Sequence, residues 1–152
     1  MKKTQTIKLI IMLLILTNSN SLLAQDTSIF QLGEKSNNVH NTGSVWLKEI
    51  NVPDSVFEFG TAFASFAPNS RLDWHYHPGG QILIITDGIG YYQEKGFPKR
   101  TVKKGDIIKC QPYVLHWHGS TQANPFSYIA SSPSQKGKTQ WLQPVTDEEY
   151  KN

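Results

Sequence analysis

Four of the five histidines in this 152-residue chain lie in two short clusters, His75-Tyr76-His77 and His116-Trp117-His118. Along a β-strand, residues i and i+2 point to the same face, so each pair directs two imidazoles to one side. Gln81 lies four residues beyond His77 and keeps the same parity. Because imidazole is a common protein ligand of transition metals, the pattern predicts two neighbouring strands that hold a metal inside a small β-barrel.

Three imidazoles and one carboxamide form the predicted ligand set: His75, His77, Gln81 and His116. All four side chains are neutral, so a divalent ion would keep its full charge, which favours Lewis-acid chemistry over the activation of oxygen. Mixed nitrogen and oxygen ligands suit Mn, Fe, Co, Ni or Zn, and the residues alone leave the metal open. Two other interpretations remain. The histidines could be polar core groups only, or the metal could be structural, although structural sites more often use four Cys and His ligands.

Further residues on these two segments extend the prediction. His118 shares the parity of His116, but two residues along a strand are about 7 Å apart, too far for both to bind one ion comfortably unless the strand bends. His118 is therefore expected to act as a general acid/base or a hydrogen-bond donor, or else to be a packed histidine. On the opposite parity, Trp74, Tyr76 and Trp117 predict an apolar face. It would pack either in a subunit interface or under the chain's own segments.

Residues 1–24 are typical of a secretory signal peptide. Three lysines precede the apolar run Leu9–Leu16, which is too short to span a bilayer, and Leu22–Ala24 suits cleavage. The chain is therefore expected in a periplasm or outside the cell, without membrane contact after cleavage. Those lysines are the only charged residues of the segment, so its removal takes the formal charge from +3 to zero. The basic residues thus give no reason to expect a nucleic-acid partner.

From Gly43 onward, short apolar stretches alternate with turn residues such as Asp87-Gly88. This predicts one all-β domain over residues 43–152, preceded by a flexible N-terminal arm at residues 25–42. The expected strands are Val45–Ile50, Phe59–Phe66, Leu72–His77, Ile82–Thr86, Ile89–Gln93, Ile107–Cys110, Leu115–His118 and Phe126–Ala130.

Two local features complete the expected fold. In the short C-terminal tail, Thr146 and Glu149 have the spacing of a capping box, which predicts a helical turn. Cys110 is the only cysteine, so it cannot form an intramolecular disulfide. A lone thiol in a strand-like segment is expected to pack in the core.

The histidine clusters and the turns around them resemble the two motifs of the cupin superfamily. The first motif is similar to Asn69-x5-His75-x-His77-x3-Gln81-x6-Gly88, in which Asn69 replaces the usual glycine and Gln81 the usual glutamate. The second is similar to Gly105-x10-His116, with Ser120 in place of the usual asparagine. Both fall within about residues 60–130. The resemblance implies a single double-stranded β-helix, or jelly-roll barrel, and the same four metal ligands.

A narrower resemblance is to a group of small bacterial single-domain cupins, carried by the segments Arg71–Gln81, His116–Gly119 and Val145–Tyr150. The group includes manganese-dependent hydroxynitrile lyases, which form or cleave cyanohydrins such as mandelonitrile. It implies Mn as the first metal to expect and His118 facing the substrate. Because small cupins generally pair, it also implies a homodimer or higher homo-oligomer.

Those lyases carry a further active-site histidine where this chain has Tyr128, and a glutamine where it has Ser132. Tyr128 is expected either to position or protonate a substrate oxygen, or to be a buried tyrosine with a bonded hydroxyl. The resemblance to these lyases therefore supports the predicted metal site more strongly than it supports lyase chemistry.

Three functions stay open on the sequence. The first is an exported metal-dependent enzyme that acts on a small oxygen-bearing substrate, with hydroxynitrile-lyase chemistry first and His118 and Tyr128 moving the proton. The second is a cupin dioxygenase that uses the same metal. The third is a non-enzymatic protein that binds a small molecule.

Overall fold

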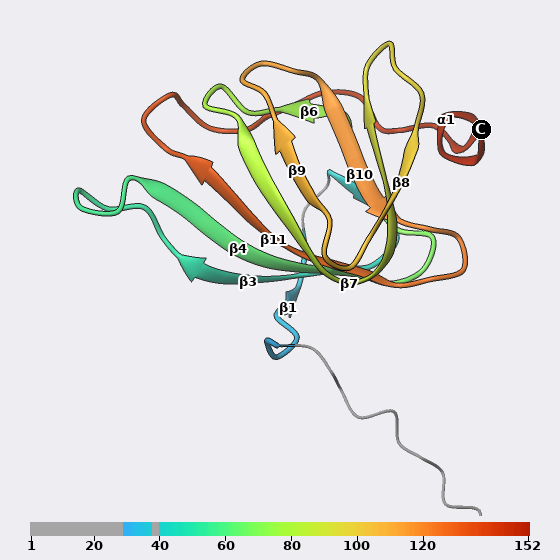
Figure 1. Cartoon of the computed structure of the whole chain (residues 1–152), viewed down its shortest axis with the longest axis horizontal. Helices are drawn as coiled ribbons and strands as arrows, with labels where there is room; N and C mark the ends of the chain where they lie inside the picture. The colour runs from blue at the N-terminus through green and yellow to red at the C-terminus, as the bar shows by residue number, and fades with distance from the viewer. Residues whose placement is uncertain (1–28, 38–39) are drawn as a thin grey trace, which may run out of the picture.

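Two antiparallel β-sheets and a short C-terminal helix make up the computed structural model, which describes residues 29–37 and 40–152 (Figure 1). The all-β class predicted from the sequence is confirmed. The elements are β1 (Glu34–Lys35), β2 (Asn41–Thr42), β3 (Val45–Asn51), β4 (Phe59–Phe66), β5 (Arg71–Leu72), β6 (His75–Tyr76), β7 (Gln81–Glu94), β8 (Arg100–Lys103), β9 (Ile107–Cys110), β10 (His116–Ser120), β11 (Phe126–Pro133), β12 (Gln140–Trp141) and α1 (Asp147–Lys151).

The strand order is β1-β3-β4-β11-β7-β10-β5-β2, and the remaining strands pair beside it. β8 and β9 both pair with β7, while β6 pairs with β10 and with β12. The sheets curl around one interior, as Figure 1 shows. Within the described ranges, no helix is long and apolar enough to cross a membrane.

The long strand β7 belongs to both sheets. Its first part pairs with β9 and β11, and its second part pairs with β8 and β10. At the crossing, Gly88 has a φ of 74°, and a Cβ there would collide with the carbonyl of Pro125. The turn predicted at Asp87-Gly88 is wrong, because this glycine bends one continuous strand from one sheet into the other.

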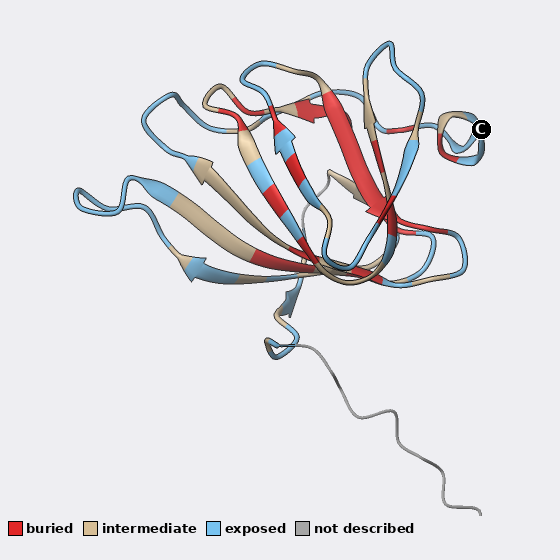
Figure 2. Cartoon of the chain, in the orientation of Figure 1, coloured by how far each residue is buried: buried red, intermediate tan, exposed pale blue. Residues whose placement is uncertain are grey.

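The main core lies between the two sheets. Burial alternates along β9, where Ile108 and Cys110 face inward and Ile107 and Lys109 face solvent. All of β10 is buried, as the red ribbon in Figure 2 shows. Cys110 is in the core as predicted, and burial raises the pKa of its thiol to about 11. It therefore packs as a small neutral side chain.

Part of the predicted N-terminal arm pairs with the barrel. β1 pairs with β3, β2 pairs with β5, and the ring centroids of Phe30 and Phe63 are 5.2 Å apart. The prediction of a loose arm is wrong for these strands, because their backbone groups hydrogen-bond to sheet edges. Residues 1–28, which include the predicted signal peptide, and residues 38–39 lie outside the described residues.

The C-terminal segment covers the outer side of β6 and β10. Trp74 and Trp117 are 1% and 0% exposed, and they pack with Val145 and Tyr150 in a second apolar cluster. The two tryptophans thus pack under the chain's own tail, so the interface suggested for them is wrong. A homodimer stays a prediction without their support.

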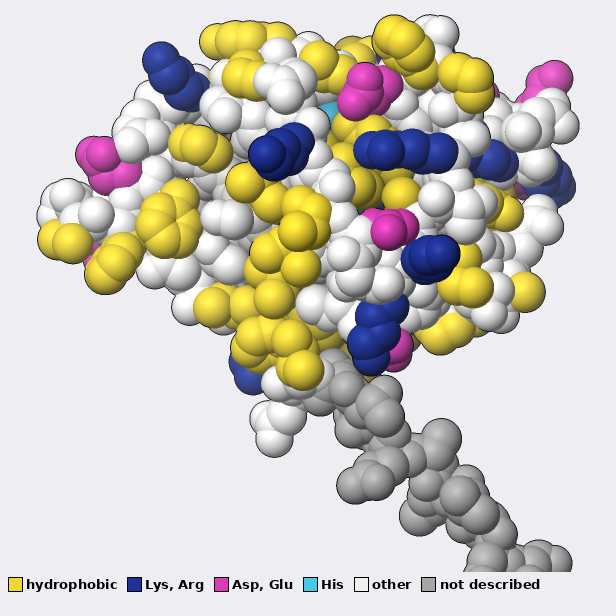
Figure 3. Space-filling model, viewed as in Figure 1, with side chains coloured by type: hydrophobic (Ala, Val, Ile, Leu, Met, Phe, Trp, Pro, Cys, Tyr) yellow, Lys and Arg dark blue, Asp and Glu magenta, His cyan; other side chains and the backbone are white. Residues whose placement is uncertain are grey.

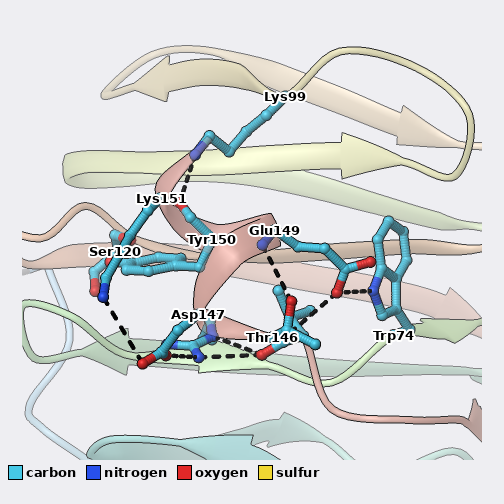
Figure 4. A network of polar contacts seen from close by, with 10 residues as sticks. Trp74, Lys99, Ser120, Thr146, Asp147, Glu149, Tyr150 and Lys151 are labelled. Carbon is cyan, nitrogen blue, oxygen red and sulfur yellow. Dashed lines mark hydrogen bonds and ion pairs between the residues drawn. The ribbon is translucent and has the colours of Figure 1, made fainter.

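A network of polar contacts fastens this tail to the barrel. The buried guanidinium of Arg71 donates to the Val145 carbonyl and to the Asp147 carboxylate, and it lies 4.5 Å from the Tyr150 ring centroid. α1 begins with the predicted capping box, in which Thr146 and Glu149 exchange hydrogen bonds (Figure 4). We call Arg71, Trp74, Trp117 and residues 145–150 the C-terminal clasp.

An apolar face remains uncovered on the outside of the sheet that contains β4, β11, β9 and the first part of β7. Ile84 lies between Ile107 of β9 and Ile129 of β11, and the first two are 42% and 62% exposed. Figure 3 shows hydrophobic side chains gathered in a stripe down the face on which β7 and β9 lie. Exposed apolar surface of this kind is typical of interaction sites. This face, unlike the tryptophan face, leaves apolar surface available for self-association.

Candidate metal centre

The two histidine clusters meet where β6 and β10 pair. His116 lies directly opposite His75 in the antiparallel register, and their ring centroids are 4.4 Å apart. The ring of His77 lies 5.2 Å from that of His75 and 5.5 Å from that of His116. All three side chains are buried. Strand parity and register together thus bring the predicted clusters to one point.

Two of these imidazoles are oriented by backbone carbonyls. The Nδ1 atom of His75 lies 2.8 Å from the carbonyl oxygen of Asp73, and that of His116 lies 2.8 Å from the carbonyl oxygen of Val114. A carbonyl oxygen only accepts hydrogen bonds, so Nδ1 carries the hydrogen and Nε2 keeps its lone pair. Metal-binding histidines usually donate such a hydrogen bond from the ring nitrogen that does not bind the metal.

Most of the buried side-chain polar atoms that lack a hydrogen-bond partner in the described chain lie at this point. They are Nε2 of His77, Nε2 of His116, Oε1 of Gln81 and both ring nitrogens of His118. An unpaired buried polar atom costs about 1–3 kcal/mol, so such groups are rare in proteins. In each neutral imidazole one ring nitrogen carries the hydrogen, and the other, like the amide oxygen of Gln81, can offer a lone pair to a cation. The residues therefore fit a divalent metal ion.

His118 lies closer to the predicted ligands than its spacing along the strand suggested. Its ring centroid is 5.1 Å from that of His75 and 5.7 Å from that of His116. One nitrogen from each of these three histidines lies within 4.8 Å of the others, so they form a group that could hold a metal ion. The structure thus adds His118 as a candidate ligand. The four-residue set with His77 and Gln81 stays a prediction.

Burial keeps these imidazoles neutral. It lowers the pKa of His75 and of His118 well below the usual value, and the neighbouring histidines lower both further. Burial also lowers the pKa of His116, and it lowers that of His77 to about 4. A neutral imidazole has a free lone pair. A metal can therefore bind at neutral pH without displacing a proton from the rings.

A cavity of about 250 Å³ borders these histidines. His75, His77, Gln81, His118 and Tyr128 give it a polar part. None of the described residues that line it is Lys, Arg, Asp or Glu. Its apolar wall includes Val45, Leu47, Ala62, Ala64, Leu72 and Ala130. The cavity therefore suits a small, mostly apolar molecule without a formal charge.

Tyr128 lies beside His118 in this cavity. Their ring centroids are 5.0 Å apart, and the planes stand at 86°. Burial raises the pKa of Tyr128, and nearby Cys110 raises it further, so the phenol keeps its proton at neutral pH. The structure thus brings both residues predicted to handle protons to the same cavity as the metal centre. Their roles stay predictions.

Thr139 and Trp141 also line the cavity, although the sequence analysis did not single them out. Trp141 lies opposite His75 in the pairing of β12 with β6, and the Thr139 hydroxyl lies 3.1 Å from Nδ1 of His77. No local motif marks these residues, because the pairing joins segments far apart in the chain. Their shared strand parity is the only signal that could have suggested a common face.

Comparison with known proteins decides the family. The profile of the Cupin domain family matches residues 62–131. The chain is also 35% identical over 112 residues to the (R)-mandelonitrile lyase of Granulicella tundricola, a match that covers 72% of this chain and 85% of that protein. This chain belongs to the cupin family.

Solved structures agree with this assignment. A cupin-like protein from Thermotoga maritima superposes on this cupin with a TM-score of 0.80 at 42% identity, and the match covers 82% of this cupin and 95% of that chain. A predicted oxalate decarboxylase from the same organism gives a TM-score of 0.60 at 20% identity, covering 68% of this cupin and 93% of that chain. The second likeness shows the fold alone. The predicted cupin barrel is confirmed.

Two departures from the cupin motifs preserve the local geometry. Asn69 has a φ of 62°, a left-handed conformation that asparagine tolerates better than most residues, so it can replace the usual glycine. The Ser120 hydroxyl donates to the carbonyl of Ala67, lies 3.0 Å from the carbonyl of Ser70 and accepts from the Ser70 amide. It thus ties β10 to the loop before β5.

Proposed function

We propose that this cupin is a metal-dependent enzyme that acts on a small oxygen-bearing molecule by Lewis-acid chemistry, with cleavage or formation of a cyanohydrin as the leading reaction. One observation carries the proposal. Buried nitrogen and oxygen atoms without partners gather beside a mostly apolar cavity that also holds Tyr128. The 35% identity to an (R)-mandelonitrile lyase supports the choice of reaction.

The metal would be held by the predicted set of His75, His77, Gln81 and His116, with Mn expected first and Fe, Zn, Ni or Co as alternatives. When bound, such an ion supplies positive charge that stabilises a developing oxygen anion. The protein supplies the rest. Its apolar wall receives the carbon part of the substrate and excludes water, and its lining holds no Lys or Arg side chain to pair with a carboxylate. This favours an aldehyde, a ketone or their neutral adducts.

We assign the proton transfer to His118, assisted by Tyr128. In cyanohydrin cleavage, the hydroxyl loses its proton, the carbon–cyanide bond breaks, and cyanide takes a proton as it leaves. Neutral His118 accepts the hydroxyl proton and then gives it to cyanide as the cyanide leaves. Tyr128 keeps its own proton and donates a hydrogen bond to the substrate oxygen.

The test is release of benzaldehyde from mandelonitrile by the Mn-loaded protein. Wild type is expected to release it well above the rate of the His75→Ala variant and of chelator-treated protein. Equal rates in wild type and His75→Ala would reject the lyase function. Oxygen uptake by iron-loaded protein with a phenolic substrate would instead support the dioxygenase. Ligand-dependent melting shifts without turnover would support a non-enzymatic binding protein.

We also propose that the protein is exported to a periplasm or beyond. The proposal rests on the lysines and the apolar run of residues 1–24. N-terminal sequencing of the mature protein is expected to begin at Gln25 or next to it. A mature protein that still begins at Met1 contradicts export by this signal.

A further inference from the structure

We propose that Thr139 is a positioning residue, which fixes the imidazole of His77 so that its Nε2 atom faces the metal centre. The inference rests on the metal centre of the proposed function and concerns a part of the chain outside both cupin motifs. Thr139 lies directly before β12, on the segment that we call the strap, residues 139–143.

The three imidazoles of the centre are held in two different ways. Nδ1 of His75 and of His116 each lie against the carbonyl two residues earlier in the same segment. Nδ1 of His77 instead lies 3.1 Å from the hydroxyl oxygen of Thr139, far away in the sequence. Thus two rings are oriented by local backbone, and the third depends on how the strap packs.

The Thr139 hydroxyl can accept a hydrogen bond from Nδ1 of His77 or donate one to it, depending on the tautomer of His77. Nε2 of His77 is buried and has no hydrogen-bond partner, and its ring lies 5.5 Å from that of His116. It can offer a lone pair only in the tautomer whose hydrogen is on Nδ1. When Nδ1 donates to the Thr139 oxygen, that tautomer and that ring orientation are stabilised together.

The strap is itself held firmly against the strand that carries the histidines. Trp141 pairs with His75 in register, and its ring centroid lies 4.8 Å from that of His40 and 4.7 Å from that of His75. The amide of Leu142 donates to the Trp74 carbonyl. Backbone pairing therefore sets the position of the Thr139 hydroxyl, which would otherwise be free to turn toward solvent.

The test compares Thr139→Val with Thr139→Ser, using Co²⁺ as the probe and a chelating dye as competitor. Valine keeps the shape but removes the hydroxyl, and loss of such a partner typically weakens metal binding about 10- to 100-fold. Serine keeps the hydroxyl and is expected to bind within about 3-fold of wild type. The visible spectrum of bound Co²⁺, which reports ligand geometry, is expected to change in Thr139→Val and not in Thr139→Ser.

The control is Thr101→Val, at an exposed position on β8, which is expected to leave Co²⁺ affinity unchanged. Melting of the metal-free proteins checks that all the variants fold. Thr139→Val that binds Co²⁺ as tightly as wild type, or Thr139→Ser that binds as weakly as Thr139→Val, overturns this inference and leaves the proposed function standing. Wild-type protein that does not bind Co²⁺ overturns both.

Discussion

The short strands β6 and β10 carry two opposite kinds of surface. On their inner side, His116 and His118 of β10 and His77, which directly follows β6, have buried ring nitrogens without partners. On their outer face, the polar atoms of the clasp are paired: the indole of Trp117 donates to Gln93, and the hydroxyl of Tyr150 donates to the Ser120 carbonyl. Neighbouring residues of this region thus point alternately to an outer face whose polar atoms are paired and to an inner face whose ring nitrogens are not.

This difference separates stability from function. A face whose polar groups are satisfied contributes to folding as it stands. A face that keeps several buried lone pairs unpaired lowers stability, and a cation that binds there would recover it. We therefore expect changes to the clasp to affect folding, and changes to the inner face to affect metal binding and chemistry.

The largest expected effect is that of Trp117→Ala on stability. It removes a fully buried indole and leaves a cavity, which costs about 3–5 kcal/mol of unfolding free energy. The matched change on the inner face is His118→Leu, which replaces two unpartnered nitrogens with apolar atoms and is expected to cost little or to stabilise. Urea unfolding of the metal-free proteins measures both. Equal losses in the two variants would remove the contrast between the faces.

Acid is expected to destabilise the metal-free protein through the inner face. The pKa of His77 falls from about 6.5 in the unfolded chain to about 4 in the folded protein. The folded state thus binds fewer protons, so stability is fully present above about pH 6.5 and falls between that value and pH 4. This one histidine contributes about 3 kcal/mol. Urea unfolding at a series of pH values measures the fall, which His77→Gln should reduce. A stability that rises on acidification contradicts the prediction.

Tyr128→Phe is expected to affect chemistry alone. It removes the hydroxyl beside His118 and should lower kcat for mandelonitrile by about 100-fold, the lower end for the loss of one hydrogen-bond donor to a developing oxygen anion. Metal content and melting temperature are expected to stay at wild-type values. Tyr92→Phe, a buried tyrosine that does not line the cavity, serves as the control and should keep its kcat. An unchanged kcat in Tyr128→Phe leaves the tyrosine with a packing role only.

The smallest effect is expected at the capping box of α1. Thr146→Ala removes the oxygen that accepts from the Glu149 amide and should cost about 1 kcal/mol of unfolding free energy. Metal affinity is expected to stay unchanged, as titration with Mn²⁺ will show. A large loss of Mn²⁺ affinity would contradict the expectation that changes to the clasp affect folding and leave metal binding unchanged.

Local rules predicted much of this molecule. The two-residue period of extended chain predicts that His75 and His77 lie close together, and their ring centroids are 5.2 Å apart. The three-residue spacing of Thr146 and Glu149 predicts the helix cap. These features depend only on neighbours in the chain. The structure therefore reproduces them without any knowledge of which strands pair.

Features that depend on long-range pairing could not be read in this way. Asp87-Gly88 suits a turn, yet Gly88 bends a continuous strand because β7 is shared by both sheets. The parity of Trp74 predicted an apolar face, but the sequence could not choose between a subunit interface and the chain's own segments as its cover, because the path of the tail decides it. Thr139 joins the metal centre only through the pairing of β12 with β6.

The central claim is that a divalent metal ion completes the inner face. It is tested most directly by the metal content of the protein purified from its natural compartment, compared with that of a His75→Ala variant prepared in the same way. The account predicts a stoichiometric divalent metal in wild type and its loss in the variant. Equal metal content in the two proteins, or none in wild type, would contradict it.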